Sequence, residues 1–154
     1  MRSSRRWTES AADESGSASL EFITVGLILL VPIVYLVLAL SAVQCAALGV
    51  DGAVRQATRV FVQQASPGDA RAAAARAIAS TLADYGIEAD GAAVTITCRP
   101  NPGACLTRRG FVTVTIGVTV PLPLAPPVLD LDLPAGLPVS ATATEQVSRF
   151  WGSW

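Results

Sequence analysis

Histidine and lysine are both absent from this sequence of 154 residues. Without histidine the chain lacks the commonest general base and the commonest transition-metal ligand. Any catalysis would depend on Asp, Glu, Tyr or Cys, and the carboxylates are scattered along the chain instead of clustered. All 11 basic residues are Arg and the net charge is −1, so there is no basic excess to displace phosphate counterions. We therefore expect no enzyme, no cofactor, no metal ion and no nucleic-acid partner.

Charge is also missing from one long stretch near the N-terminus. No charged residue occurs between Glu21 and Asp51, and residues 22–43 are almost wholly apolar. A helix of about 20 apolar residues, rising 1.5 Å per residue, crosses a hydrocarbon layer of about 30 Å. Pro32 lies inside this run, and spanning helices tolerate the kink that we expect there. The sequence predicts a single-pass membrane protein in contact with membrane lipid.

Two other interpretations of the apolar run fit the sequence less well. A secretory signal has an apolar region of 7–15 residues, which is shorter than this one, so a secreted protein is the weaker alternative. A lipoprotein anchor at Cys45 is disfavoured because Val43 and Gln44 replace the small residues that such a site prefers. We expect Cys45 to serve as a small apolar residue at the outer end of the helix.

The basic residues around the apolar run give its orientation. Arg2, Arg5 and Arg6 precede the run, whereas Arg55 and Arg59 follow it. An excess of three over two favours a cytoplasmic N-terminus. The C-terminal domain is therefore expected to be extracytoplasmic.

The segment before the apolar run reads ESGSASLEF from Glu14 to Phe22. A short charged leader ends at Gly16, four small or apolar residues follow, and Glu21 stands alone at the edge of the run. On physical grounds alone, a carboxylate at a helix N-terminus is stabilised by the helix dipole. Capping of the helix at the membrane boundary is therefore one interpretation of Glu21.

The same segment, with the apolar run after it, resembles the type IV pilins, and among them the TadE-like minor pilins of the tight-adherence (Tad/Flp) branch. The resemblance covers Arg2 to about Gln64. It implies cleavage between Gly16 and Ser17 by a prepilin peptidase, after which Glu21 is the fifth residue of the mature chain. It also implies that Glu21 meets the amino terminus of a neighbouring subunit when the helices bundle into a filament.

The sequence departs from the major pilins in three respects. The mature chain would begin with Ser17 where the best-known pilins have Phe, and Phe22 follows the glutamate where the major Flp pilins have Tyr. This chain also keeps a domain of its own after the helix, which the short Flp pilins lack. These departures point to a minor subunit.

The resemblance implies a set of partners and leaves alternatives open. The implied partners are the prepilin peptidase, other pilin subunits and the pilus assembly platform, in the membrane or in a surface pilus that serves adhesion. A TadF-like protein or a pseudopilin of a secretion system fits equally well. An alternative of another class is a membrane-tethered extracytoplasmic binding module that is never cleaved.

After the apolar run the sequence predicts two helical segments. The first continues to about residue 65 as a stem, whose apolar face comprises Val50, Val54, Ala57 and Phe61. The second begins at the cap Ser66-Pro67-Gly68-Asp69, where Asp69 occupies the capping-box position, and ends before Gly86. Its apolar face is expected to comprise Ala74, Ile78, Leu82 and Tyr85.

The hydrophobic period then changes from 3.6 to 2, which is typical of strands. Three antiparallel strands are expected, around residues 94–98, 112–120 and 139–147. An apolar, proline-rich loop from Pro121 to Pro138 is expected either to cover the sheet or to contact another subunit. The role of the two C-terminal tryptophans, Trp151 and Trp154, is left open by the sequence.

Cys98 and Cys105 flank the turn between the first two strands. In an oxidising compartment this spacing predicts a disulfide, whereas two thiols without His make only half a zinc site. The expected fold is α+β and pilin-like: a long transmembrane helix and stem, a second helix, and a small antiparallel sheet. The expected organisation is a leader at 1–16, helix and stem at 17–65, and a domain at 66–154.

Overall fold

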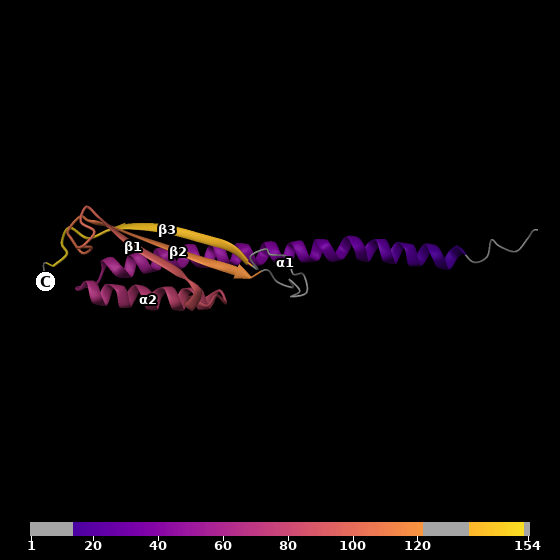
Figure 1. Cartoon of the computed structure of the whole chain (residues 1–154), viewed down its shortest axis with the longest axis horizontal. Helices are drawn as coiled ribbons and strands as arrows, with labels where there is room; N and C mark the ends of the chain where they lie inside the picture. Colours follow the sequence, from indigo (N-terminus) through magenta and orange to yellow (C-terminus); the bar gives the residue numbers. More distant parts are fainter. Residues whose placement is uncertain (1–13, 122–135, 153–154) are drawn as a thin grey trace, which may run out of the picture. The chain divides into compact units, whose positions relative to one another are not determined.

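The computed structural model describes residues 14–121 and 136–152, and side chains from residue 18. Figure 1 shows the order of its elements along the chain. These are α1 (Glu14–Val62), α2 (Pro67–Asp84), the short 3-10 helix η1 (Ala89–Gly91), β1 (Ala93–Arg99), β2 (Phe111–Pro121) and β3 (Gly136–Gln146). The predicted α+β layout of one long helix, a second helix and a small antiparallel sheet is confirmed.

The chain divides into two compact units, Met1–Leu38 and Ala39–Trp154. In the first unit the structure describes the apolar part of α1, in which Pro32 does not end the helix. The second unit contains the rest of α1 together with α2 and the sheet. The helical stem that the sequence predicted is therefore part of the compact domain.

The sheet has the strand order β1-β2-β3, and both pairs are antiparallel. The β2–β3 register runs without a skipped residue from Phe111 opposite Gln146 to Pro121 opposite Gly136. The sequence placed Pro121 and residues 136–138 in the loop, and this boundary is wrong because backbone pairing continues through them. Residues 122–135, which carry the rest of the expected loop, lie outside the described residues.

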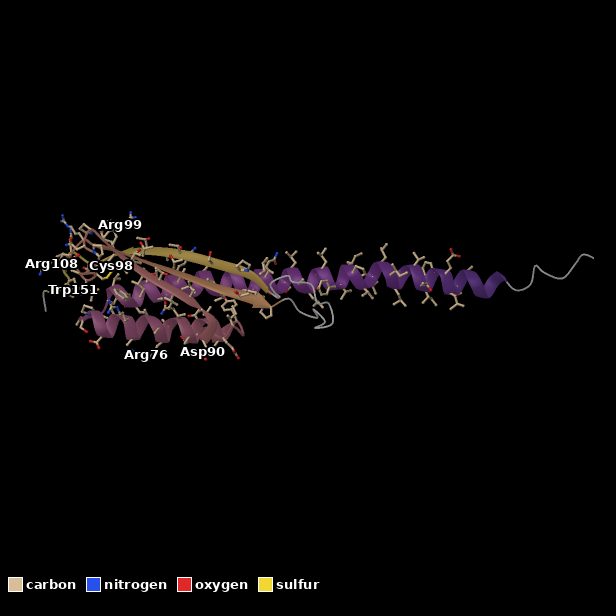
Figure 2. The ribbon with its side chains drawn as sticks, in the orientation of Figure 1. Arg76, Asp90, Cys98, Arg99, Arg108 and Trp151 are labelled. Atoms are coloured by element: carbon tan, nitrogen blue, oxygen red, sulfur yellow. A yellow bond between two sulfur atoms is a disulfide. The ribbon has the colours of Figure 1, made fainter. Side chains whose placement is uncertain are left out.

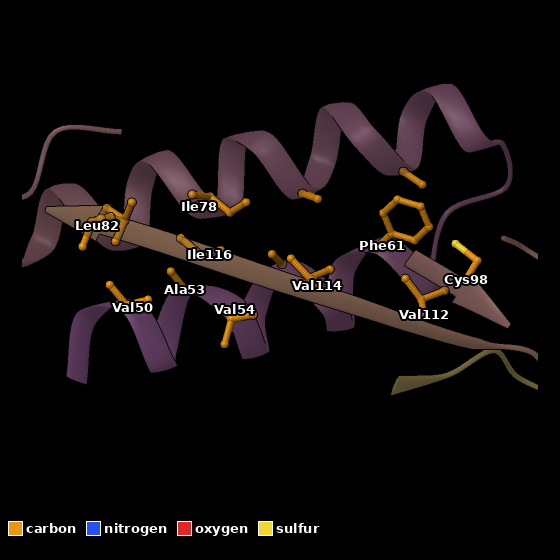
Figure 3. Close-up of a cluster of buried hydrophobic side chains, with 14 of the residues drawn as sticks. Val50, Ala53, Val54, Phe61, Ile78, Leu82, Cys98, Val112, Val114 and Ile116 are labelled. Carbon is orange, nitrogen blue, oxygen red and sulfur yellow. The ribbon is translucent and has the colours of Figure 1, made fainter. Parts of the chain in front are cut away.

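One face of the sheet packs on both helices of the second unit, as Figure 3 shows for α1, α2 and β2. Val50, Val54 and Phe61 of the stem are at most 1% exposed, as their helical spacing predicted. The alternate residues of β2 meet them from the sheet, and the buried members are Val112, Val114, Ile116, Val118 and Val120. The one buried polar residue in this core, Thr58, donates its hydroxyl to the Val54 carbonyl at 2.6 Å.

Local chemistry sets the ends of α2. The Ser66 hydroxyl oxygen accepts from the Asp69 N–H at 3.2 Å and donates to the Asp69 carboxylate at 2.7 Å. At the other end Gly86 adopts a φ of 70°, which favours glycine. Ala74, Ile78 and Leu82 are buried, but Tyr85 is 46% exposed. The predicted apolar face is therefore wrong at Tyr85, because α2 ends at Asp84 and Tyr85 caps it.

Candidate functional site

The expected cleavage site lies at the beginning of α1. The helix starts at Glu14, so Gly16 and Ser17 belong to its first turn. The first four N–H groups of a helix have no acceptor within the helix. Unwinding this turn therefore breaks few hydrogen bonds, which makes the backbone between these two residues one of the easiest in α1 to open.

Glu21 follows where the apolar surface of the helix begins. Its side chain is exposed and has no ion-pair partner in the part of the chain that the structure describes. Phe22, beside it, is 81% exposed. Both side chains are therefore available to a molecule outside this chain.

The part of α1 that follows carries apolar side chains on all sides. Figure 2 shows them projecting from the helix away from its axis. The Leu, Ile, Val and Phe residues from Leu20 to Leu40 are 46–81% exposed, whereas Tyr35 is partly buried. The Thr24 hydroxyl donates a local hydrogen bond to the Leu20 carbonyl, at 2.8 Å, within the same helix. A surface of this kind is stable only in lipid or against other apolar helices.

By length and composition this is the one helix in the described residues that could cross a membrane. Its most apolar window has a mean hydropathy of 2.8, and none of that window is buried within the chain. A core helix of a soluble protein would be covered by its own chain. The described residues therefore contain one helix, near the N-terminus, that is long and apolar enough to span a membrane, which is consistent with single-pass anchoring.

The expected disulfide joins Cys98, at the end of β1, to Cys105 in the following turn. Their Cα atoms are 5.1 Å apart, within the range for a disulfide. Cys98 is buried in the core and Cys105 packs against it. The third cysteine, Cys45, is free and exposed. The disulfide ties the turn to the core at the end of the sheet where β1 ends.

Trp151 closes the domain at the end of β1 and is labelled in Figure 2. Its indole N–H donates to the carbonyl of Gln64 at 2.9 Å, and its own carbonyl accepts from Arg108 Nε at 2.8 Å. The first bond joins the C-terminal segment to the end of α1, which the sequence pattern could not reveal. Trp151 therefore completes the core, whereas Trp154 lies outside the described residues.

One groove of the second unit has a volume of 590 Å³. Ala42, Cys45, Tyr85, Ile87 and Val120 contribute to its mostly apolar lining, and Glu88 is the one charged residue there. Within residues 14–121 and 136–152, no three His, Cys, Asp or Glu residues lie close enough to hold a metal ion. The groove offers no pair of acid and base groups at a common point.

The predicted site residues fall into two groups. Gly16, Ser17, Glu21 and Phe22 share two turns of one helix, and the disulfide belongs to the other unit. Glu21 and Phe22 are exposed and Cys98 is buried, so of these residues Glu21 and Phe22 are available for contact with other molecules. No family model, no curated protein and no solved structure matches this chain.

Proposed function

We propose that this protein is a minor pilin or pseudopilin subunit of the Tad/Flp type, processed by a prepilin peptidase and assembled through its N-terminal helix. The observation that carries the proposal is the position of Glu21. It is an exposed carboxylate without an ion-pair partner in the described chain, five residues after Gly16 and at the point where the exposed apolar surface of α1 begins.

The apolar helix is suited to both the membrane before assembly and the filament after it. Before assembly, lipid covers the side chains between Leu20 and Leu40. In a filament, the same side chains pack against the helices of neighbouring subunits. Because the helix has no covered face of its own, it can be surrounded by either environment.

Glu21 has a specific task in the filament. Cleavage after Gly16 leaves an ammonium group on Ser17 at the edge of the apolar surface. When helices bundle and water leaves, an unpaired buried charge costs several kcal/mol. The carboxylate of Glu21 on a neighbouring subunit is the natural counter-charge, and pairing it with Ser17 sets the axial register of the two helices.

In this proposal the second unit is a folded domain that the helix carries. It holds its own core and disulfide, so it remains folded whether the helix lies in lipid or in a bundle. In this proposal the domain lies outside the cytoplasm, where an oxidising environment maintains the bond between Cys98 and Cys105.

The cleavage step gives the direct test. Membrane-extracted protein from cells with the peptidase should have an intact mass that begins at Ser17. Gly16→Leu should block processing, because the bulky side chain occupies the position at the scissile bond. Gly26→Leu is the matched control, since nothing lies within 4 Å of a Cβ at Gly26 and it is remote from the bond. Retention of residues 1–16 in the parent protein would contradict the proposal.

An uncleaved membrane-tethered binding module is the second candidate. The continuity of α1 across Gly16 and Ser17 favours it, because proteases cut extended backbone and this bond is helical. The same mass measurement separates the two functions. A tether keeps its leader in the presence and in the absence of the peptidase.

A further inference from the structure

The three-stranded sheet has two edges, formed by β1 and β3. An edge strand carries backbone N–H and C=O groups with no partner on one side and can pair with another chain. Natural edges are protected by proline, by bulges or by charged residues that point toward the core side. The two edges of this sheet differ in this respect.

β3 carries two such protecting residues. Pro138 lies in its first part, where it removes one backbone donor. Near its end Glu145 is opposite Val112, a buried residue, so the carboxylate of Glu145 is on the core side of the sheet. A strand added beside β3 would meet this charge, so β3 is poorly suited to pairing.

β1 carries neither kind of protection between Ala93 and Cys98. Its register against β2 has no bulge, and it contains no proline. Val94 and Ile96 lie on the core side, because their partners Ile116 and Val114 are buried. Only Arg99, the last residue, is charged. Within residues 14–121 and 136–152, no strand pairs with this side of β1, so its six successive residues from Ala93 to Cys98 present an open and uncharged edge.

An apolar groove of 230 Å³ lies directly beside this edge. Ala74, Ala75 and Ile78 of α2 form one wall, Val94 and Ile96 form the other, and Arg71 and Ala89 complete the lining. Val94 is 43% exposed although it points to the core side. A further strand would cover Val94 and place its own alternate side chains in this groove.

We propose that the free edge of β1 binds an extended segment of a partner protein by strand addition. The residues of the segment that face α2 are apolar and fill the groove beside Val94. The residues on the other face are threonine or serine, because they continue rows of threonines such as Thr95, Thr115 and Thr142 across the outer face of the sheet. In this chain such rows form hydroxyl bonds, for example between Thr115 and Thr142 at 3.0 Å.

The groove also specifies a charge in the partner. Arg71 lines it and has no ion-pair partner within residues 14–121 and 136–152. We therefore assign the partner segment a carboxylate where it passes Arg71. A second copy of this chain fits poorly, because its own β1 contains no carboxylate. The inference does not depend on the proposed pilin function, since it uses only the second unit.

Fluorescence anisotropy on the detergent-solubilised full chain tests the proposal. The probe is a labelled nine-residue peptide that begins with valine, alternates valine and threonine, and has glutamate in place of the last valine, so that the carboxylate shares the valine face. The reference peptide has proline in place of the threonine at its fourth position, which interrupts the ladder. We expect at least tenfold tighter binding of the probe than of the reference, and slower amide hydrogen exchange in residues 93–99 on binding.

Two matched pairs of variants locate the site. Val94→Lys should weaken binding at least tenfold, whereas Leu137→Lys should change it less than twofold. Leu137 is the corresponding apolar residue on the core side of β3, and it is 46% exposed. Ala75→Glu fills the groove from the exposed side of α2 and neutralises Arg71, so it should weaken binding at least fivefold without touching the sheet. Ala72 lies on the same helix but outside the groove lining, so Ala72→Glu should leave binding unchanged.

Three results would overturn the proposal. The first is equal binding of the two peptides, or none of either. The second is equal loss of binding in Val94→Lys and Leu137→Lys, which would place the peptide elsewhere. The third is a dimer of the parent chain that becomes a monomer in Ala75→Glu, because a second copy would then occupy the edge. Unfolding midpoints of all variants ensure that only folded protein is compared.

Discussion

The two halves of helix α1 have similar apolar side chains and opposite surroundings. Phe22, in the first half, is 81% exposed, whereas Phe61, in the second half, is 1% exposed. In the second half the buried apolar residues from Ala46 to Phe61 share one face, which packs in the core with α2 and the sheet. The first half is apolar on every face, so no single domain of this chain could cover it. The first half therefore requires an environment made by other molecules, and the second half supplies its own.

Substitution of the two phenylalanines gives the largest contrast between the halves. Phe61→Ala should lower the free energy of unfolding of the domain by about 3–5 kcal/mol, because it leaves a cavity in the core. Phe22→Ala should change it by less than about 0.5 kcal/mol, since this side chain is 81% exposed. Chemical denaturation in mild detergent, followed by tryptophan fluorescence, measures both. Equal effects would mean that the first half is packed against the domain.

The disulfide should have the next largest effect, and only on the second unit. Replacement of Cys98 and Cys105 by serine should cost about 2–3 kcal/mol, because a short loop in the unfolded chain is no longer closed. Cys45→Ser is the control, since that thiol is free and exposed. The same denaturation experiment applies. A comparable loss in Cys45→Ser would show that this exposed position within α1 contributes to the core.

Two glycines three residues apart sharpen the comparison within the stem. A Cβ at Gly49 would lie 2.8 Å from Cγ of Tyr85, whereas a Cβ at Gly52 meets only a methyl group of Thr81 at 3.6 Å. Gly49→Ala should destabilise the domain by about 1–2 kcal/mol, because the ring must move. Gly52→Ala should stabilise it by about 0.5–1 kcal/mol through helix propensity. Unfolding midpoints that shift in the same direction would contradict this packing.

The sequence predicted most of the fold because its periodicities are simple. Phe61 and Val54 of the stem, and the alternate valines of β2, lie where spacings of 3.6 and 2 place them. The errors concern ends of elements. Tyr85 continues the helical spacing but lies beyond the last helical residue, and Pro121 has the composition of a loop but is paired in β2. Backbone pairing between distant segments decides such boundaries, and a local sequence pattern carries no information about that pairing.

The candidate sites were predictable to different degrees. Gly16 and Glu21 could be found from the sequence because their signal is a spacing along one chain segment. The bond between Trp151 and Gln64 joins residues 87 positions apart, and no periodicity relates them. The open edge of β1 could be identified only from the strand order of the sheet. In the sequence Val94 has the pattern of a core residue, and nothing shows that β1 has a neighbouring strand on one side only.

Incorporation of Glu21 variants into assemblies tests the central claim most directly. Glu21→Ala should leave membrane levels unchanged and reduce the protein found in sheared surface filaments, or crosslinked to the major subunit, by at least tenfold. Glu21→Asp should be partly tolerated because it keeps the charge. Glu14→Ala is the matched control, since it removes one carboxylate from the proposed leader, which would be absent from the assembled protein. Incorporation of Glu21→Ala at the level of the parent protein would contradict the assembly function and favour the uncleaved tether.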